Sequence, residues 1–178
     1  MILDIERTWD GGAALPGERV RIALSRSARG ARDDWRIEVD APFHGDPAPA
    51  SPPGPTPRLF EHEVVEVFLL APPDTYLEVE LGPHGHHLVL ALEGVRNAVR
   101  EELAIAYAVA REGARWRGVA VVPGSLVPAG VSHLNAFAIH GAGAARRHLA
   151  WRPAAGRAPD FHRLDVFAPF DAEALRVG

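Results

Sequence analysis

Carboxylate and imidazole side chains are concentrated in the segment from Tyr76 to Gly94, which reads YLEVELGPHGHHLVLALEG. Glu78 and Glu80 alternate with apolar residues, and three histidines follow within four positions. Such residues could bind a divalent metal ion, act as an acid and a base, or accept hydrogen bonds from a polar ligand. The choice among these roles depends on whether the surrounding strands bring the side chains together.

The same segment predicts a β-hairpin, because apolar and polar residues alternate on both sides of Gly82-Pro83-His84-Gly85. If these four residues form the loop, Glu80 pairs with His87, and apolar side chains gather on one face. The apolar face would carry Leu77, Val79, Leu88 and Leu90. The opposite face and the loop tip would carry Tyr76, Glu78, Glu80, His87 and, at the tip, His84.

Three interpretations of this polar group remain open. The group could be a solvated outer face with a weak cross-strand pair between Glu80 and His87. It could bind zinc or another divalent ion, although the helical HxxxH spacing is missing. It could also bind a saccharide, since carboxylates accept hydrogen bonds from hydroxyl groups and an aromatic ring packs against the apolar face of a pyranose.

The elements that would position these residues are strands. Short segments with a period of two recur along the chain, as in ERVRIALS and WRIEVDA, and helical patterns are scarce. Val64 to Leu70 is almost continuously apolar, which is typical of a central strand covered on both faces. We therefore expect an all-β protein, an antiparallel β-sandwich formed by one domain over residues 1–178, with a short C-terminal helix that Asp171 caps.

A proline-rich segment interrupts the strands between Ala41 and Arg58. It holds seven prolines and two glycines, so it can form neither a helix nor a regular ladder. We expect an ordered surface loop that either connects strands of one sheet system or forms the rim of a binding site.

Composition excludes several classes of function. The 178 residues carry a net charge of −4 and no basic block, which argues against nucleic acid as a partner. The absence of cysteine excludes disulfides, thiolate metal sites and cysteine nucleophiles. We expect no signal peptide and no membrane span, because the N-terminus is acidic and no apolar run reaches about 18 residues. The expected location is therefore the cytoplasm.

Several motifs resemble those of one family. APFHGDPAPA, EVVEVFLL, YLEVELGPHGHHLVL, WRGVAVVP, NAFAIHG and PDFHRL, which lie between Trp35 and Phe167, resemble a small uncharacterised family related to family-9 carbohydrate-binding modules and DOMON-like domains. The resemblance implies a jelly-roll-like β-sandwich with a concave face. The residues that match the family pattern are Glu66, Glu78, Glu80, His84, Asn135, His140, Asp160 and His162.

The resemblance also raises the question of a bound group. Sugar-binding members of the wider group use a tryptophan clamp, and this chain has four tryptophans, of which Trp35 and Trp116 lie in strongly patterned strands. Haem-binding members use a methionine and a histidine as iron ligands, whereas the only methionine here is Met1. Haem is therefore not expected, while a divalent metal ion remains possible.

Two functions follow from these residues. The first is a non-catalytic binding module for a carbohydrate or a similar polyhydroxylated ligand on the concave sheet face. The alternative is a metal-assisted hydrolase that uses the same glutamates and histidines, in which the catalytic residues are not identified. The expected ligand-binding residues are Glu66, Glu78, Glu80, His84, His87, Asn135, His140 and His162.

Overall fold

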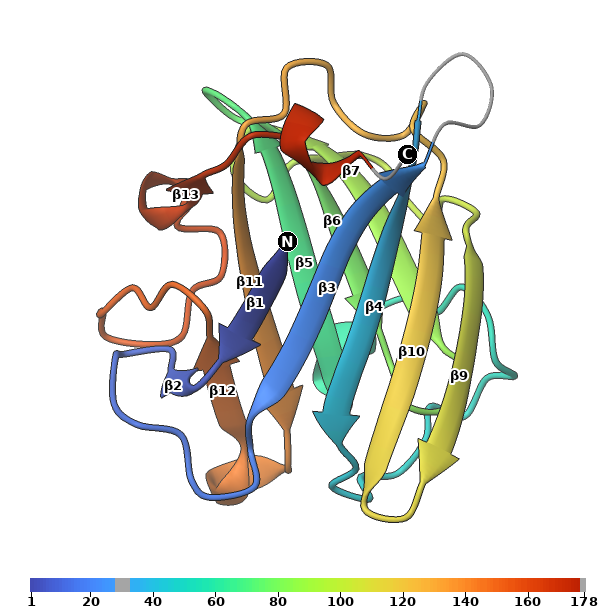
Figure 1. Ribbon diagram of the computed structural model, residues 1–178. Helices are drawn as coiled ribbons and strands as arrows, with labels where there is room; N and C mark the ends of the chain where they lie inside the picture. Colours follow the sequence, from blue (N-terminus) through green and yellow to red (C-terminus); the bar gives the residue numbers. More distant parts are fainter. Residues whose placement is uncertain (28–32, 177–178) are drawn as a thin grey trace.

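The computed structural model describes residues 1–27 and 33–176. Its strands form two antiparallel sheets, with the smaller sheet in front of the larger in Figure 1. The smaller sheet has the order β1-β3-β4-β10-β9. Its strands are β1 (Ile2–Ile5), β3 (Val20–Ser27), β4 (Asp34–Pro42), β9 (Ala106–Glu112) and β10 (Arg115–Val122).

The larger sheet has the order β2-β12-β11-β5-β6-β7-β8, and β13 also pairs with β11. Its strands are β2 (Arg7–Thr8), β5 (Val64–Ala71), β6 (Thr75–Leu81), β7 (His87–Glu93), β8 (Ala98–Arg100), β11 (His133–His140), β12 (Arg147–Ala150) and β13 (Ala168–Pro169). Four short 3-10 turns complete the described elements: η1 (Leu59–Glu61), η2 (Gly143–Ala145), η3 (Leu164–Val166) and η4 (Glu173–Leu175). The expected antiparallel β-sandwich is confirmed.

The main core lies between the two sheets. Successive side chains of a strand point to opposite faces, so every second residue of each strand enters this core. In β6, Leu77 and Val79 have no exposed surface, and they belong to the same apolar cluster as Ile22 and Ile37 of the smaller sheet. The predicted assignment of Leu77 and Val79 to the apolar face is therefore correct.

A second apolar cluster covers the outer face of the larger sheet. Phe68 and Tyr76 on this face are fully buried, and they cluster with Leu59 of η1 and with Phe161 and Phe167 near the C-terminus. The larger sheet is consequently covered on both faces over its central strands. This explains why every residue of β5 is buried, as its nearly continuous apolar sequence predicted.

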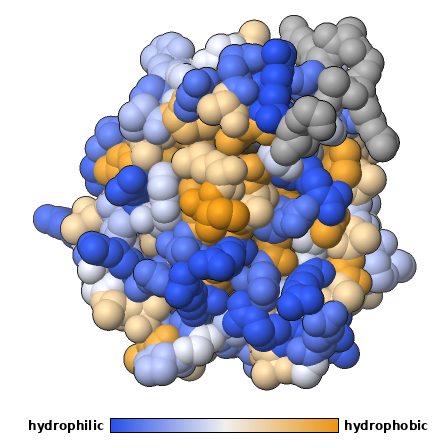
Figure 2. All heavy atoms as spheres, viewed as in Figure 1, coloured by the Kyte–Doolittle hydropathy of each residue, from blue (hydrophilic) through white to orange (hydrophobic). Residues whose placement is uncertain are grey.

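The smaller sheet has a charged outer face instead. Arg21 forms a salt bridge with Asp4 at 2.8 Å, and Arg115 forms one with Asp40 at 2.6 Å, with both arginines exposed and both aspartates half-buried. Figure 2 shows hydrophilic residues over much of the face viewed in Figure 1. Because exposed ion pairs add little to binding or stability, we place no site on this face.

The predicted register of the β6–β7 hairpin is wrong by one residue. Leu81 pairs with His87 and Glu80 with Leu88, so the loop has five residues, 82–86, rather than four. The Gly82 N–H donates to the His86 carbonyl at 2.9 Å, and the His86 ring contacts the Ser51 carbonyl at 2.8 Å. The extra loop residue turns His87 toward the core between the sheets and turns Leu88 and Leu90 to the glutamate face, the reverse of the expectation.

The proline-rich loop is shorter than predicted, because Ala41 and Pro42 still pair with β10 as the end of β4. From Phe43 onward the chain leaves the sheet. Farther along, the Thr56 N–H donates to the His87 carbonyl at 2.9 Å, and the His87 N–H donates to the Gly54 carbonyl at 3.0 Å. The loop is thus ordered, as expected, although part of it pairs with the start of β7.

The predicted C-terminal helix is a single 3-10 turn, η4. Asp171 accepts a hydrogen bond from the Glu173 N–H at 2.9 Å, as the expected cap would. The chain becomes extended at Arg176, which forms a parallel bridge with Arg26 of β3, and this pairing ends the turn. Over the residues that the structure describes, no helix has the length and apolar character needed to cross a membrane.

Candidate functional site

Four of the predicted site residues converge on the outer face of the larger sheet. Glu66 lies on β5, directly opposite Glu80 on β6, and Glu78 lies two residues before Glu80 on the same face. His162, which precedes η3, has its Nε2 atom 4.0 Å from a carboxyl oxygen of Glu78. Alternation in YLEVEL predicted the shared face of Glu78 and Glu80 correctly, whereas Glu66 was included through the family resemblance and joins this face through the pairing of β5 with β6.

Two adjoining cavities of about 190 and 270 Å³ open onto these residues. Glu66 lines the first, Glu80 lines the second, and Glu78 and His162 line both. We call the two cavities together the glutamate pocket. Its further lining residues are Phe60, Arg96, Ile139, His148, Pro159, Phe161, Pro57, Arg58, Leu88, Leu90, Leu92, Ala98 and Glu101.

The three glutamates are buried, with exposed fractions of 2% for Glu66, 5% for Glu78 and 1% for Glu80. Each has at least one carboxyl oxygen without a hydrogen-bond partner. Burial raises the pKa of Glu78 to about 7. Burial, followed by the charges of the neighbouring glutamates, raises the pKa of Glu66 and of Glu80 well above the ordinary value.

A chain of hydrogen bonds fixes the state of His162. The Tyr76 hydroxyl accepts a hydrogen bond from the Arg96 N–H at 3.0 Å, and its other partner among the described residues is His162 Nδ1 at 2.7 Å. Because the buried hydroxyl proton has no acceptor there other than this nitrogen, we assign the hydroxyl as the donor to His162 Nδ1. His162 Nδ1 is then an acceptor, and Nε2 carries the proton that faces Glu78. Burial lowers the pKa of His162 to about 4, which keeps this ring neutral at pH 7.

The rim of the glutamate pocket combines an aromatic ring with paired charges. Phe60 is 47% exposed, and it lines both pocket cavities and a third cavity of about 400 Å³ that adjoins them. Arg146 holds the Phe60 carbonyl by a hydrogen bond. Arg96 is bound to Asp160 at 2.6 Å. The rim thus presents an apolar surface beside a polar floor.

His87 and His140 lie apart from this pocket, on the inner side of the larger sheet. Neither nitrogen of the His87 ring has a hydrogen-bond partner, and the ring packs edge-on against Tyr107. His140 shares the inner face with Ala136 and Ala138, and its Nε2 is 3.1 Å from Glu18. The predicted placement of His87 with the glutamates is wrong because of the register shift.

Asn135 and His84 have structural partners. Asn135 shares the outer face of the sheet with the glutamates, but its side chain binds the backbone N–H and carbonyl of Arg152 at 3.0 and 2.9 Å. His84 lies at the hairpin loop, as predicted, where its Nε2 is 3.2 Å from the Asp46 carbonyl. Both residues therefore hold loops in place and do not line the glutamate pocket.

Sequence reasoning did not identify Phe60, Arg96 and His148 as pocket residues. Phe60 lies in a 3-10 turn whose sequence, RLFEH, carries no periodic signal. Arg96 follows β7 in a tight turn with a φ of 60°. Asp160, which the family pattern included, binds Arg96 and also the His162 N–H at 3.0 Å, so it orients two pocket residues from outside. In the sequence, only the family resemblance pointed to the segment that contains Asp160 and His162.

Within the described residues, the divalent metal ion that the sequence left possible has no geometric support. Among residues 1–27 and 33–176, no three histidine, aspartate or glutamate side chains are arranged so that they could hold an ion together. The three glutamates are close on one sheet face, yet His162 offers its protonated nitrogen to Glu78 rather than a free electron pair. The pocket is therefore better suited to hydrogen bonding than to metal coordination.

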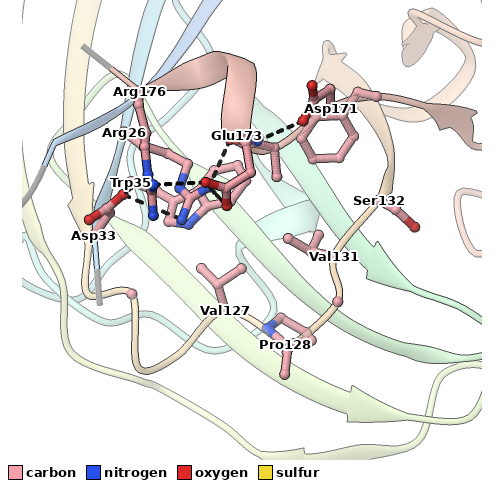
Figure 3. A pocket seen from close by; sticks show the side chains of 15 residues that line it. Arg26, Asp33, Trp35, Val127, Pro128, Val131, Ser132, Asp171, Glu173 and Arg176 are labelled. Atoms are coloured by element: carbon pink, nitrogen blue, oxygen red, sulfur yellow. Dashed lines mark hydrogen bonds and ion pairs between the residues drawn. The ribbon is translucent and has the colours of Figure 1, made fainter. Parts of the chain in front are cut away.

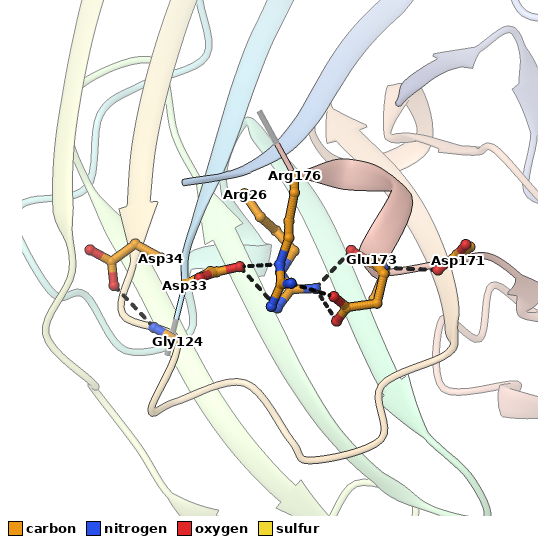
Figure 4. Close-up of polar contacts among 8 residues, drawn as sticks. Arg26, Asp33, Asp34, Gly124, Asp171, Glu173 and Arg176 are labelled. Carbon is orange, nitrogen blue, oxygen red and sulfur yellow. Dashed lines mark hydrogen bonds and ion pairs between the residues drawn. The ribbon is translucent and has the colours of Figure 1, made fainter. Parts of the chain in front are cut away.

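A larger cavity, of about 520 Å³, lies elsewhere and is lined by Trp35, Val127 and the C-terminal turn (Figure 3). Its charged groups are mutually paired. Arg26 binds the Ala172 carbonyl at 2.8 Å and Glu173 at 3.0 Å, and Arg176 binds Asp33 at 2.6 Å (Figure 4). These pairs close the edge of the sandwich, and none of the predicted site residues lies there.

The hydrogen-bond chain can be tested with Tyr76→Phe. Loss of the hydroxyl leaves the buried His162 Nδ1 and the Arg96 N–H without partners, and we expect a loss of about 1 to 3 kcal/mol in the free energy of unfolding. Imidazole nitrogen shifts measured by NMR should also show that His162 loses its preference for the tautomer protonated at Nε2.

Tyr107→Phe is the matched control, since the Tyr107 hydroxyl donates to the Gly82 carbonyl at 2.8 Å, away from His162. It should destabilise the protein while leaving the His162 resonances unchanged. An unchanged His162 tautomer in Tyr76→Phe would contradict the assigned chain.

These features define the class of protein: an antiparallel two-sheet β-sandwich with a carboxyl-lined pocket on the outer face of its larger sheet. UPF0462 protein C4orf33 homolog from Rattus norvegicus is 44% identical over 98% of this chain and 90% of its own length. UPF0462 protein C4orf33 from Homo sapiens is 41% identical over 98% of this chain and 90% of its own length. The chain belongs to the UPF0462 family.

A solved structure shares the fold. This crystal structure from Bacteroides uniformis, described as that of "a putative carbohydrate-binding protein", covers 95% of this chain and 84% of its own, with a TM-score of 0.66 and 18% identity. At this identity, the similarity shows a common fold. No family model matches the chain, and the relation to family-9 carbohydrate-binding modules and DOMON-like domains stays a prediction.

Proposed function

We propose that this protein is a non-catalytic binding module that holds a saccharide or a similar polyhydroxylated ligand in the glutamate pocket. The observation that carries the proposal is the position of the exposed Phe60 ring beside buried carboxyl groups whose oxygens lack partners. A pyranose has the complementary surfaces, because its C–H face packs on an aromatic ring and its hydroxyl groups donate to carboxyl oxygens.

Two further observations support this proposal. The cavities of about 190 and 270 Å³ together reach the lower part of the range of about 300 to 1,000 Å³ that is typical of small-ligand sites. The solved structure with the same fold carries a carbohydrate-binding description. The predicted relation to family-9 carbohydrate-binding modules fits the same function.

The aromatic side chain proposed to pack against the sugar ring is Phe60, not the tryptophan that the resemblance implied. Trp35 and Trp116 are buried in the core, with exposed fractions of 2% and 1%. Of the described residues that line the glutamate pocket, none is a tryptophan. Phe60 therefore takes the place of the tryptophan clamp.

The alternative hydrolase is not favoured by the geometry. Glu66 and Glu80 oppose each other on neighbouring strands, which lie about 4.8 Å apart, so both reach the pocket from the same floor. A glycosidase places its two carboxyl groups on either side of the scissile bond. The glutamates are thus arranged to contact one side of a ligand.

A thermal-shift screen of monosaccharides and short oligosaccharides, followed by calorimetric titration of the best hit, tests the function. Phe60→Ala should weaken that binding by about tenfold, the equivalent of one aromatic contact. It should change the melting temperature of the ligand-free protein very little, because the ring is half exposed.

Leu15→Ala is the control, since Leu15 is an apolar residue with 57% exposure that does not line the pocket. It should bind the hit as the wild type does. Release of a cleaved product from the hit would contradict the non-catalytic function. Equal affinities of Phe60→Ala and the wild type for the hit would show that Phe60 is not part of the binding site.

A further inference from the structure

The floor of the glutamate pocket holds three carboxyl groups without a matching positive charge. Glu66 and Glu80 are paired across neighbouring strands, and Glu78 lies beside Glu80 on the same face. All three are at least nine-tenths buried and line the pocket, and four of their oxygens lack a hydrogen-bond partner. Buried acidic groups are normally paired, so this arrangement needs an explanation.

The positive charges nearby are engaged with other partners. Their contacts are Arg96 with Asp160, Arg58 with Glu61, and Arg146 with the carbonyls of Phe60 and Glu61. Burial lowers the pKa of both pocket histidines, His148 and His162, which favours their neutral forms. Within residues 1–27 and 33–176, no basic side chain forms a salt bridge with Glu66 or Glu80.

A primary ammonium group would supply the positive charge and the hydrogen-bond donors that the floor of the pocket lacks. It carries a compact positive charge and three N–H donors, which matches a cluster of acceptor oxygens from three carboxyl groups. A neutral hydroxyl group offers one donor and no charge, so it would leave the acids protonated. A cation among the three groups would favour their ionised forms and would gain charge-assisted hydrogen bonds in a site with little water.

We propose that the ligand of the glutamate pocket is an amino sugar whose ammonium group binds among Glu66, Glu78 and Glu80, with its ring against Phe60. This inference rests on the proposed saccharide-binding function and specifies its substrate class. The aromatic rim selects the sugar ring, and the carboxyl floor selects the amine.

The test compares ligands that differ at one position. Glucose, N-acetylglucosamine and glucosamine share a ring, and only glucosamine carries a protonated amine at about pH 6.5. Calorimetric titration of each into the wild-type protein should give an affinity for glucosamine at least tenfold higher than for the two neutral sugars. Cyclohexylamine, which has a ring and an ammonium group but no hydroxyl groups, should bind more weakly than glucosamine.

Proton release provides a second readout. Since the raised pKa values of the glutamates leave them protonated before binding, an ammonium ligand should displace protons into the buffer. The binding enthalpy of glucosamine should therefore vary with the ionisation enthalpy of the buffer. A neutral sugar should show no such variation.

Substitutions of the glutamates test whether the preference for glucosamine and the proton release come from the carboxyl groups on the floor of the glutamate pocket. Glu78→Gln combined with Glu80→Gln should remove the preference for glucosamine and the proton release. Glu63→Gln is the matched control, since Glu63 is also a buried glutamate, but it binds the His44 and Asp46 N–H groups outside the glutamate pocket. It should keep both effects.

The outcomes separate the two proposals. Equal affinities for the three sugars would overturn the amino-sugar inference and leave the saccharide-binding function standing. Failure of all three sugars to bind would overturn the function itself. Binding of cyclohexylamine as tight as that of glucosamine would overturn both, because hydroxyl groups would then contribute nothing to recognition.

Discussion

Replacement of Glu78 and Glu80 together by glutamine should raise the free energy of unfolding of the ligand-free protein at about pH 8 by several kcal/mol. Above pH 7 the folded protein must ionise carboxyl groups that it holds in a buried and acidic environment. For Glu78 alone, a pKa of about 7 against an ordinary value of 4.5 corresponds to a cost on the order of 3 kcal/mol at high pH. Glutamine occupies a similar volume and carries no charge.

The direction of the glutamate pKa shifts determines how the stability difference between the two proteins changes with pH. A folded-state pKa above the unfolded value means that the folded protein binds more protons, so stability falls as pH rises from about 4.5 through 7. The advantage of the double variant should therefore increase as the pH rises from about 4.5 through 7 and be smallest at about pH 4.5. The histidines with lowered pKa change stability in the opposite direction, and His140, which contacts Glu18 away from the glutamate pocket, does so equally in both proteins.

Urea unfolding of both proteins at several pH values measures this difference. Glu93→Gln on the exposed end of β7 is the control, and its free energy of unfolding should stay within about 0.5 kcal/mol of the wild-type value at each pH. A double variant that is less stable than the wild type at about pH 8 would mean that positive charges compensate the carboxylates in the folded protein. This result would contradict the absence of a cationic partner for the glutamates, on which the proposed ligand binding depends.

Val79→Asp should destabilise the protein by about 4 kcal/mol or more, the largest loss that we expect from one substitution. Val79 has no exposed surface, and it packs in the core between the two sheets. Aspartate at this position would place a polar group among apolar side chains that offer it no hydrogen-bond partner. Denaturant unfolding measures the loss.

Val99→Asp is the matched control, because Val99 lies on the short strand β8 with 47% of its surface exposed. It should change the free energy of unfolding by less than about 0.5 kcal/mol. If the two variants were equally stable, the face of β6 that carries Val79 would not be the core face, and the glutamates two positions along would have to be reassigned as well.

The sequence by itself determined the type of fold and one side of the site. Alternation is a local property of a strand, so YLEVEL was enough to place Glu78 and Glu80 on one face and Val79 on the other, whereas Glu66 was included only through the family resemblance. Likewise, the nearly continuous apolar run of β5 indicated a strand covered on both faces before its covering segments were known.

Local pattern did not determine the hairpin register. Four-residue and five-residue loops are both compatible with GPHGH, and each leaves apolar residues to face the core on the second strand. Contacts with the proline-rich loop accompany the longer loop, since His86 contacts the Ser51 carbonyl and His87 pairs with Gly54 and Thr56 through the backbone. His87 therefore lies outside the predicted site, and the contacts that accompany this register come from the proline-rich loop, about 30 positions earlier in the sequence.

The character of the site was decided only by the tertiary structure. A strand pattern cannot say whether a polar face meets water, and here η1 and the segment around Phe161 fold over it. Burial beneath these segments raises the pKa of the glutamates, and the placement of Tyr76 against His162 fixes the proton on Nε2. Solvent exclusion depends on which distant segments cover a face, whereas alternation depends on neighbours along the chain.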